Sequence, residues 1–127
     1  MANDDRVAIW SNVPDGAQLR ISVKGTTSSA LVTARALVLP GKGDRTRLRD
    51  ADLQPGPAVV ALSSSAERYT TLLDIVYTTN ATAEVSADVV AGGNSIPPDG
   101  SSAGPFTSTL PGAKGQSIPV TFVVVMA

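Results

Sequence analysis

The sequence predicts a single all-β domain over residues 1–127, an antiparallel β-sandwich of the jelly-roll or Ig-like kind, with a closed β-barrel as the second choice. Three observations lead to this prediction. Hydrophobic residues make up 43% of the chain and charged residues only 17%, a low charge for a surface made of helices. Valine and threonine, which favour strands, are abundant. Short alternating segments recur between turns that use many of the 11 glycines and 9 prolines.

Four strands are expected in the first half of the chain, over residues 7–10, 18–24, 30–39 and 57–62. The clearest is 18–24, where Leu19, Ile21 and Val23 alternate with polar residues and predict one buried face. The charged stretch 42–56 reads as a long surface loop.

In the second half, strands are expected over 82–90, 106–110 and 117–126, and the stretch 92–104, rich in glycine, serine and proline, reads as a long exposed loop. Residues 63–80 fit two structures. A capping box of Ser64 and Glu67 would start a helix, whereas β-branched and aromatic residues favour a strand. We prefer the strand, which brings the total to seven or eight.

The segments 30–39 and 117–126 are apolar on both of their faces. Such a strand is either an interior strand, as in the middle of a barrel, or has an outer face covered by a partner. Because a small sandwich shields few strands on both sides, we favour burial against another copy of the chain. The sequence therefore favours a structural or assembly subunit that forms a homo-oligomer, such as a virion or particle component. Arg35 lies inside one of these apolar segments, so it needs a counter-charge or a route to solvent.

The chain contains no cysteine and no histidine. This composition excludes disulfides, cysteine nucleophiles, histidine acid–base catalysis and a zinc site of the usual thiolate and imidazole type. We accordingly expect no enzyme activity, no catalytic residues, no metal and no cofactor.

The best candidate ligand-binding residues are Asp50 and Asp52, two positions apart in the 42–56 stretch. Carboxylates bind calcium, magnesium and sugar hydroxyls, although neighbouring arginines also explain these two as part of a solvated charged loop. The alternative function is thus a carbohydrate- or small-ligand-binding module that uses the 42–56 and 92–104 loops.

Arg45, Arg47 and Arg49 would project from one face of an extended backbone and are candidates for contact with an anion or a partner. Nearby aspartates nearly cancel their charge, no aromatic ring stands between them to stack on bases, and the net charge of the chain is −1. We therefore do not expect nucleic acid as a partner.

Residues 1–6 are polar and show no signal peptide. The apolar run 120–127 is too short to cross a bilayer. These features predict a soluble protein with no membrane partner, located in the cytoplasm or in a virion.

Overall fold

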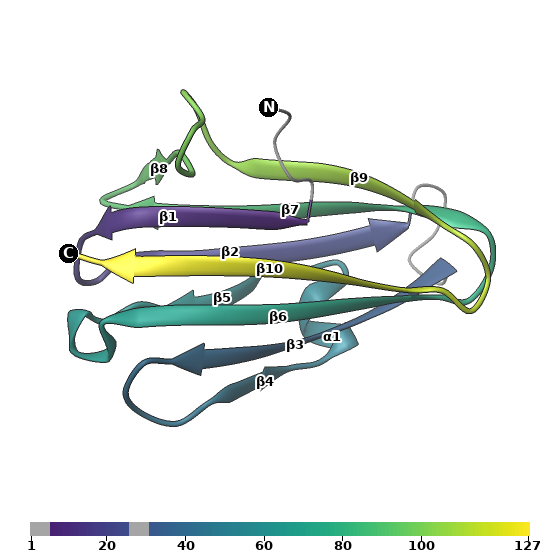
Figure 1. The fold of residues 1–127 in the computed structure, drawn as a ribbon, viewed down its shortest axis with the longest axis horizontal. Coiled ribbons are helices and arrows are strands. Elements are labelled where there is room, and N and C mark those ends of the chain that lie inside the picture. Colours follow the sequence, from purple (N-terminus) through teal and green to yellow (C-terminus); the bar gives the residue numbers. More distant parts are fainter. Residues whose placement is uncertain (1–5, 26–30) are drawn as a thin grey trace.

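Ten β-strands account for most of the chain in the computed structural model, which describes residues 6–25 and 31–127 (Figure 1). The strands are β1 (Val7–Val13), β2 (Gln18–Gly25), β3 (Val32–Pro40), β4 (Thr46–Leu48), β5 (Ala58–Ala61), β6 (Arg68–Tyr77), β7 (Ala81–Ala91), β8 (Asn94–Ile96), β9 (Phe106–Gly112) and β10 (Ser117–Met126). One helical turn, α1 (Asp50–Leu53), follows β4, and a 3₁₀ turn, η2 (Ser64–Ala66), precedes β6.

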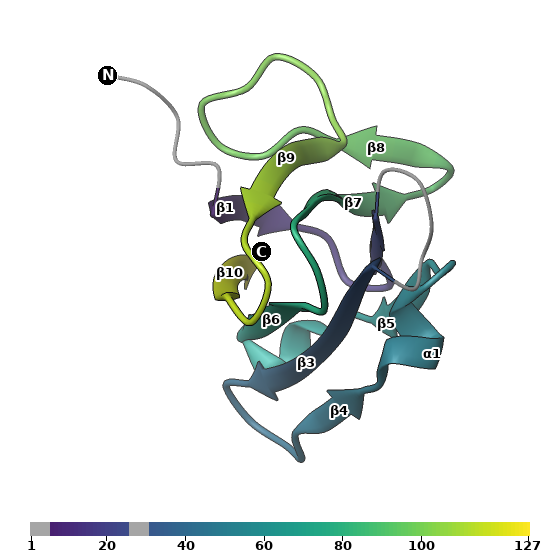
Figure 2. The same cartoon turned by 90° about the vertical axis from the view of Figure 1, so that its right-hand side faces the viewer.

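The strands form two stacked sheets, seen almost end-on in Figure 2. Sheet A has the strand order β1-β10-β6-β3-β4. Sheet B has the order β5-β2-β7, and β8 and β9 both pair with the far side of β7. The pairings are antiparallel apart from β1, which runs parallel to β10.

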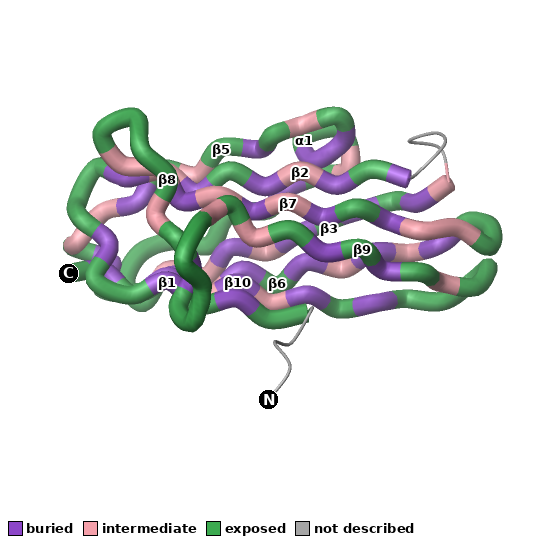
Figure 3. Tube along the Cα trace, turned by 90° about the horizontal axis from the view of Figure 1, so that it is seen from above, coloured by how far each residue is buried: buried purple, intermediate pink, exposed green. Residues whose placement is uncertain are grey.

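The core lies between the two sheets and follows from side-chain alternation along the strands, visible as alternating buried and exposed segments in Figure 3. Its largest fully buried side chains include Trp10, Tyr77 and Phe122. The rings of Trp10 and Phe122 meet edge to face with centroids 6.1 Å apart. The Trp10 Nε1–H donates to the Ile96 carbonyl at 2.9 Å, which satisfies the only polar atom of the indole.

The predicted all-β sandwich is confirmed, and the described residues form no closed barrel. The preferred strand within 63–80 is confirmed as β6. The helical alternative is wrong because Tyr69, Leu73 and Tyr77 alternate with outward residues into the core. Ser64 begins only the short 3₁₀ turn.

Two expected loops contain regular structure. The stretch 42–56 includes β4 and α1, because Leu48 and Leu53 are buried apolar residues set among its charges. The stretch 92–104 includes β8, where Ile96 pairs with Val89 and packs on the core. Part of the expected strand 30–39, Ala30, lies outside the described residues.

Candidate functional site

The outer face of sheet A gathers exposed and half-buried apolar residues. Leu72 in the middle strand is 45% exposed, and Val7 and Ile9 of β1 are 40% and 41% exposed. Val125 of β10 is also exposed. The same face carries four half-buried apolar residues, with the polar Thr70 and Thr121 between some of them. The four are Leu37 and Leu39 on β3, Val76 on β6 and Val123 on β10.

The strand register places these residues side by side. Leu72 pairs with Leu37 of β3 and with Thr121 of β10, which in turn pairs with Val7. The next row joins Ile9 to Val123. The two segments predicted to be apolar on both faces, 30–39 and 117–126, therefore lie in one sheet on either side of β6 and turn their second faces the same way.

The outer face of sheet B is polar by contrast. Its strands present alternating serine, threonine and charged residues: Arg20, Ser22, Lys24, Glu84, Ser86, Asp88, Thr107 and Thr109. Lys24 and Glu84 are paired in register, with Nζ and Oε2 3.6 Å apart. On the described part of this face, the exposed large apolar residue is Val59 of β5, and Val90 of β7 is half-buried. The apolar character of sheet A is therefore a property of one face and not of the whole surface.

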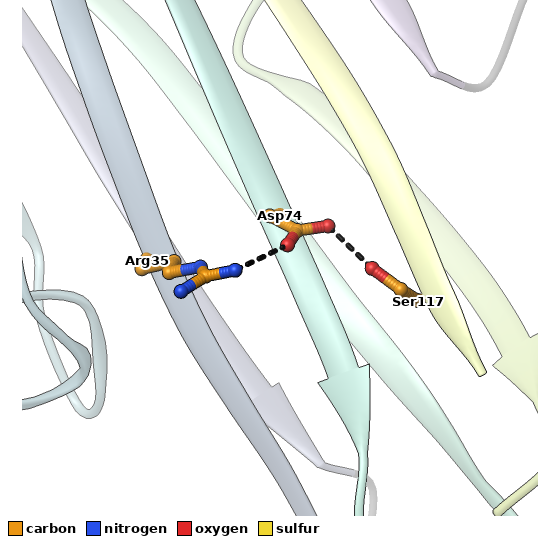
Figure 4. A network of polar contacts seen from close by, with 3 residues as sticks. All are labelled: Arg35, Asp74 and Ser117. Carbon is orange, nitrogen blue, oxygen red and sulfur yellow. Dashed lines mark hydrogen bonds and ion pairs between the residues drawn. The ribbon is translucent and has the colours of Figure 1, made fainter. Parts of the chain in front are cut away.

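One polar network crosses the apolar face (Figure 4). The Arg35 guanidinium lies 3.4 Å from Oδ2 of Asp74, and Ser117 Oγ donates to Oδ1 of the same carboxylate at 2.6 Å. These residues come from β3, β6 and β10, so the network ties three strands together. The predicted need of Arg35 for a counter-charge or solvent is confirmed, since its side chain is 78% exposed and pairs with Asp74.

The three candidate arginines lie in and beside β4: Arg47 is within the strand, Arg45 precedes it and Arg49 follows it. Arg47 pairs in register with Leu37, and both Arg47 and Arg49 line a depression of about 850 Å³ on the outer face of sheet A. Arg35 lines the same depression, whereas Arg45 does not. Within residues 6–25 and 31–127, neither Arg45, Arg47 nor Arg49 has a carboxylate within 4.0 Å.

Asp50 and Asp52 both hold backbone groups in place. Oδ1 of Asp50 accepts hydrogen bonds from the Ala34 N–H at 2.8 Å and from Nε2 of Gln54 at 2.6 Å. Oδ2 of Asp52 accepts the Arg49 N–H at 2.8 Å, at the start of α1. No group of three or more potential metal ligands occurs in the part of the chain that the structure describes.

The two stretches proposed to form a ligand site lie at opposite edges of the sandwich (Figure 2). The 42–56 stretch follows β3 and includes β4, at one edge of sheet A. In the 92–104 stretch, Asp99 lies at the other edge, where its N–H donates to the Ile9 carbonyl and its carboxylate accepts Ser11 Oγ. The structure does not bring the two stretches together.

Two shifted pKa values in exposed groups belong to a single ion pair outside the apolar face. Nζ of Lys42 lies 2.9 Å from Oε1 of Glu67. This hydrogen bond raises the pKa of Lys42 and lowers the pKa of Glu67.

Leu72, Val7 and Ile9 are not among the site residues predicted from the sequence. Their apolar character was visible, but their common face depends on the pairing of β1 and β6 with β10. Among the described residues, no helix has the length and apolar character needed to cross a membrane. Comparisons of the chain with protein-family models, with curated proteins and with solved structures find no match.

Proposed function

We propose that this chain is a non-enzymatic structural subunit that self-associates through the outer face of sheet A. The observation that carries the proposal is the contrast between the two outer faces. Among residues 6–25 and 31–127, four of the five large hydrophobic residues with substantial exposure lie on sheet A, and the fifth, Val59, lies on sheet B. The four are Val7, Ile9, Leu72 and Val125. A face that gathers exposed apolar residues in this way is typical of an interaction site.

The size of the face supports a second copy as the occupant. Five strands spaced about 4.8 Å apart, each roughly eight residues long at about 3.3 Å per residue, present roughly 600 Å². Two such faces packed together bury about 1,200 Å², the lower end of the range for specific interfaces. Sheet-on-sheet packing between copies repeats the arrangement that already forms the core. Such a surface fits a subunit of a particle built from many copies, such as a virion.

Light scattering after size-exclusion chromatography, over a series of protein and salt concentrations, tests the proposal. We expect a defined multimer that persists at high salt, because apolar contacts are not screened. Leu72→Lys should give a monomer, since it places a charge in the middle of the face. Val59→Lys is the matched control, because Val59 is equally apolar and 53% exposed on the other sheet, and it should leave the multimer intact.

A wild-type chain that stays monomeric at high concentration would overturn the proposal. A multimer that survives Leu72→Lys but dissociates with Val59→Lys would assign the contact to sheet B instead. Far-UV circular dichroism of both variants shows whether they remain folded.

A further inference from the structure

The depression beside β4 has a mixed chemistry that the apolar face as a whole does not share. It occupies about 850 Å³ between β3, β4 and β6, within the usual range of ligand pockets. Its apolar floor includes the directly paired Leu37 and Leu72. Arg35, Arg47 and Arg49 line the same depression.

The backbone of β4 explains why two arginines face the depression. Leu48 is buried in the core, and the residues on either side of it in an extended chain must point the other way. Arg49 keeps the extended conformation, with φ −94° and ψ 166°. Arg47 and Arg49 therefore project together from the outer face.

The charges in the depression are unequally satisfied. Its two carboxylates are already engaged, Asp50 by Ala34 and Gln54, and Asp74 by Arg35 and Ser117. In the described part of the chain, Arg47 and Arg49 have no carboxylate within 4.0 Å. Two guanidinium groups thus remain available beside an apolar floor.

We propose that this depression binds a short peptide segment of a partner in which acidic side chains stand next to apolar ones. A guanidinium presents a planar fork of N–H donors that matches a carboxylate in a bidentate pair. The leucine floor supplies contact for an adjacent aliphatic side chain. The residues that line the depression include no aromatic ring, so the bases of a nucleic acid would have no stacking platform there.

This site goes beyond the proposed self-association, although Leu37 and Leu72 belong to both surfaces. A bound peptide and a second copy would therefore compete. Peptide binding is best measured on an Ile9→Lys variant. This substitution places a charge on β1, in the outer face of sheet A but away from the depression, and so should prevent self-association. If the wild-type chain is already monomeric, the same assay applies to it unchanged, so either proposal can fail alone.

The test uses fluorescence polarisation with a fluorescein-labelled peptide that alternates glutamate and leucine. We expect saturable binding at low salt that weakens at about 300 mM NaCl, because the Debye length shortens. Arg47→Glu combined with Arg49→Glu should weaken binding at least about tenfold, the loss of roughly 1.4 kcal/mol. Arg20→Glu, on the outer face of sheet B, is the control and should change the affinity less than about twofold, as expected for a distant site.

Equal affinity of the double arginine variant and the control would overturn the proposal, as would equal binding of a peptide with lysine in place of glutamate. A single-stranded RNA that binds the same arginines more tightly than the peptide would also overturn it and assign the depression to nucleic acid.

Discussion

The Asp50 carboxylate accepts the backbone N–H of Ala34 at 2.8 Å, so a side chain of α1 stands where a neighbouring strand would otherwise pair with β3. β4 pairs only with Ala36, Leu37 and Val38. Beyond β4, Gln54 donates from Nε2 to the Val32 carbonyl at 2.9 Å. Two side chains four residues apart thus form hydrogen bonds with backbone groups of β3 that could otherwise pair with a strand of another chain.

Replacing Asp50 with alanine should lower the free energy of unfolding by about 1–3 kcal/mol, because the Ala34 N–H loses its acceptor. Asp50→Asn should retain most of the stability, since its amide oxygen can accept the same bond. Urea unfolding monitored by circular dichroism measures both changes.

Asp44→Ala provides the control for that measurement. Asp44 is an exposed carboxylate in the turn between β3 and β4, and its loss should change the stability by less than about 0.5 kcal/mol. An Asp50→Ala chain as stable as the Asp44→Ala chain would show that the edge contact contributes nothing.

Local pattern predicted the strands but not their neighbours. Alternation identified β2, β7 and β10, where one side of each strand is consistently apolar. The charges around Leu48 and Leu53 hid β4 and α1, because three- and four-residue elements give too short a pattern to detect. The parallel pairing of β1 with β10 joins segments more than 100 residues apart and has no local signal.

The candidate site could be predicted only in part for the same reason. The apolar second faces of 30–39 and 117–126 were evident from sequence, but their union through Leu72 depends on β6 lying between β3 and β10. Asp50 was chosen for its oxygen ligands, and the sequence could not show that Ala34 and Gln54 already occupy them. Both the common apolar face and the partners of Asp50 depend on tertiary contacts, which a local sequence pattern does not contain.

Stability should fall at alkaline pH through Tyr77. Its hydroxyl donates to the Leu110 carbonyl, and burial raises the pKa of Tyr77 above its ordinary value. Above about pH 10 the unfolded chain therefore releases the tyrosine proton before the folded chain does, and the free energy of unfolding decreases as pH rises. Below that pH the contribution is fully present.

Tyr77→Phe should lower the free energy of unfolding by about 1 kcal/mol near pH 7, because the hydrogen bond is lost. Its stability should also decline less than that of the wild type as the pH rises above about 10. Urea unfolding of the wild type and of Tyr77→Phe across this pH range gives the comparison. Lysine deprotonation affects both proteins equally, so it cancels in the difference between their free energies of unfolding. Parallel declines in the two chains would contradict the assignment to Tyr77.

Gly112 should not tolerate a side chain. A Cβ built there would lie 2.6 Å from Cε1 and Cζ of Tyr77, a ring that is only 1% exposed and cannot move aside. Gly112→Ala should therefore destabilise the fold by about 1–3 kcal/mol, measured as a shift of the urea midpoint. In a Tyr77→Ala background the same change should cost less than half as much, and an unchanged cost would show that the ring is not the obstacle.

Replacing Glu67 with glycine should give a more stable protein than replacing it with alanine. Its backbone has φ 66° and ψ −43°, a conformation that a Cβ disfavours. The Glu67 N–H donates to the Ser64 carbonyl at 3.1 Å, and the Glu67 carbonyl accepts the Met126 N–H at 2.9 Å. These two hydrogen bonds hold the backbone in that conformation.

Glu67→Gly and Glu67→Ala both remove the exposed ion pair with Lys42, so that loss cancels in the comparison. Glycine should raise the free energy of unfolding by about 1 kcal/mol over alanine, after its larger unfolded-state entropy is counted. Thermal unfolding of the two variants measures the difference, and an alanine variant that is equally or more stable would show that this backbone stores no strain.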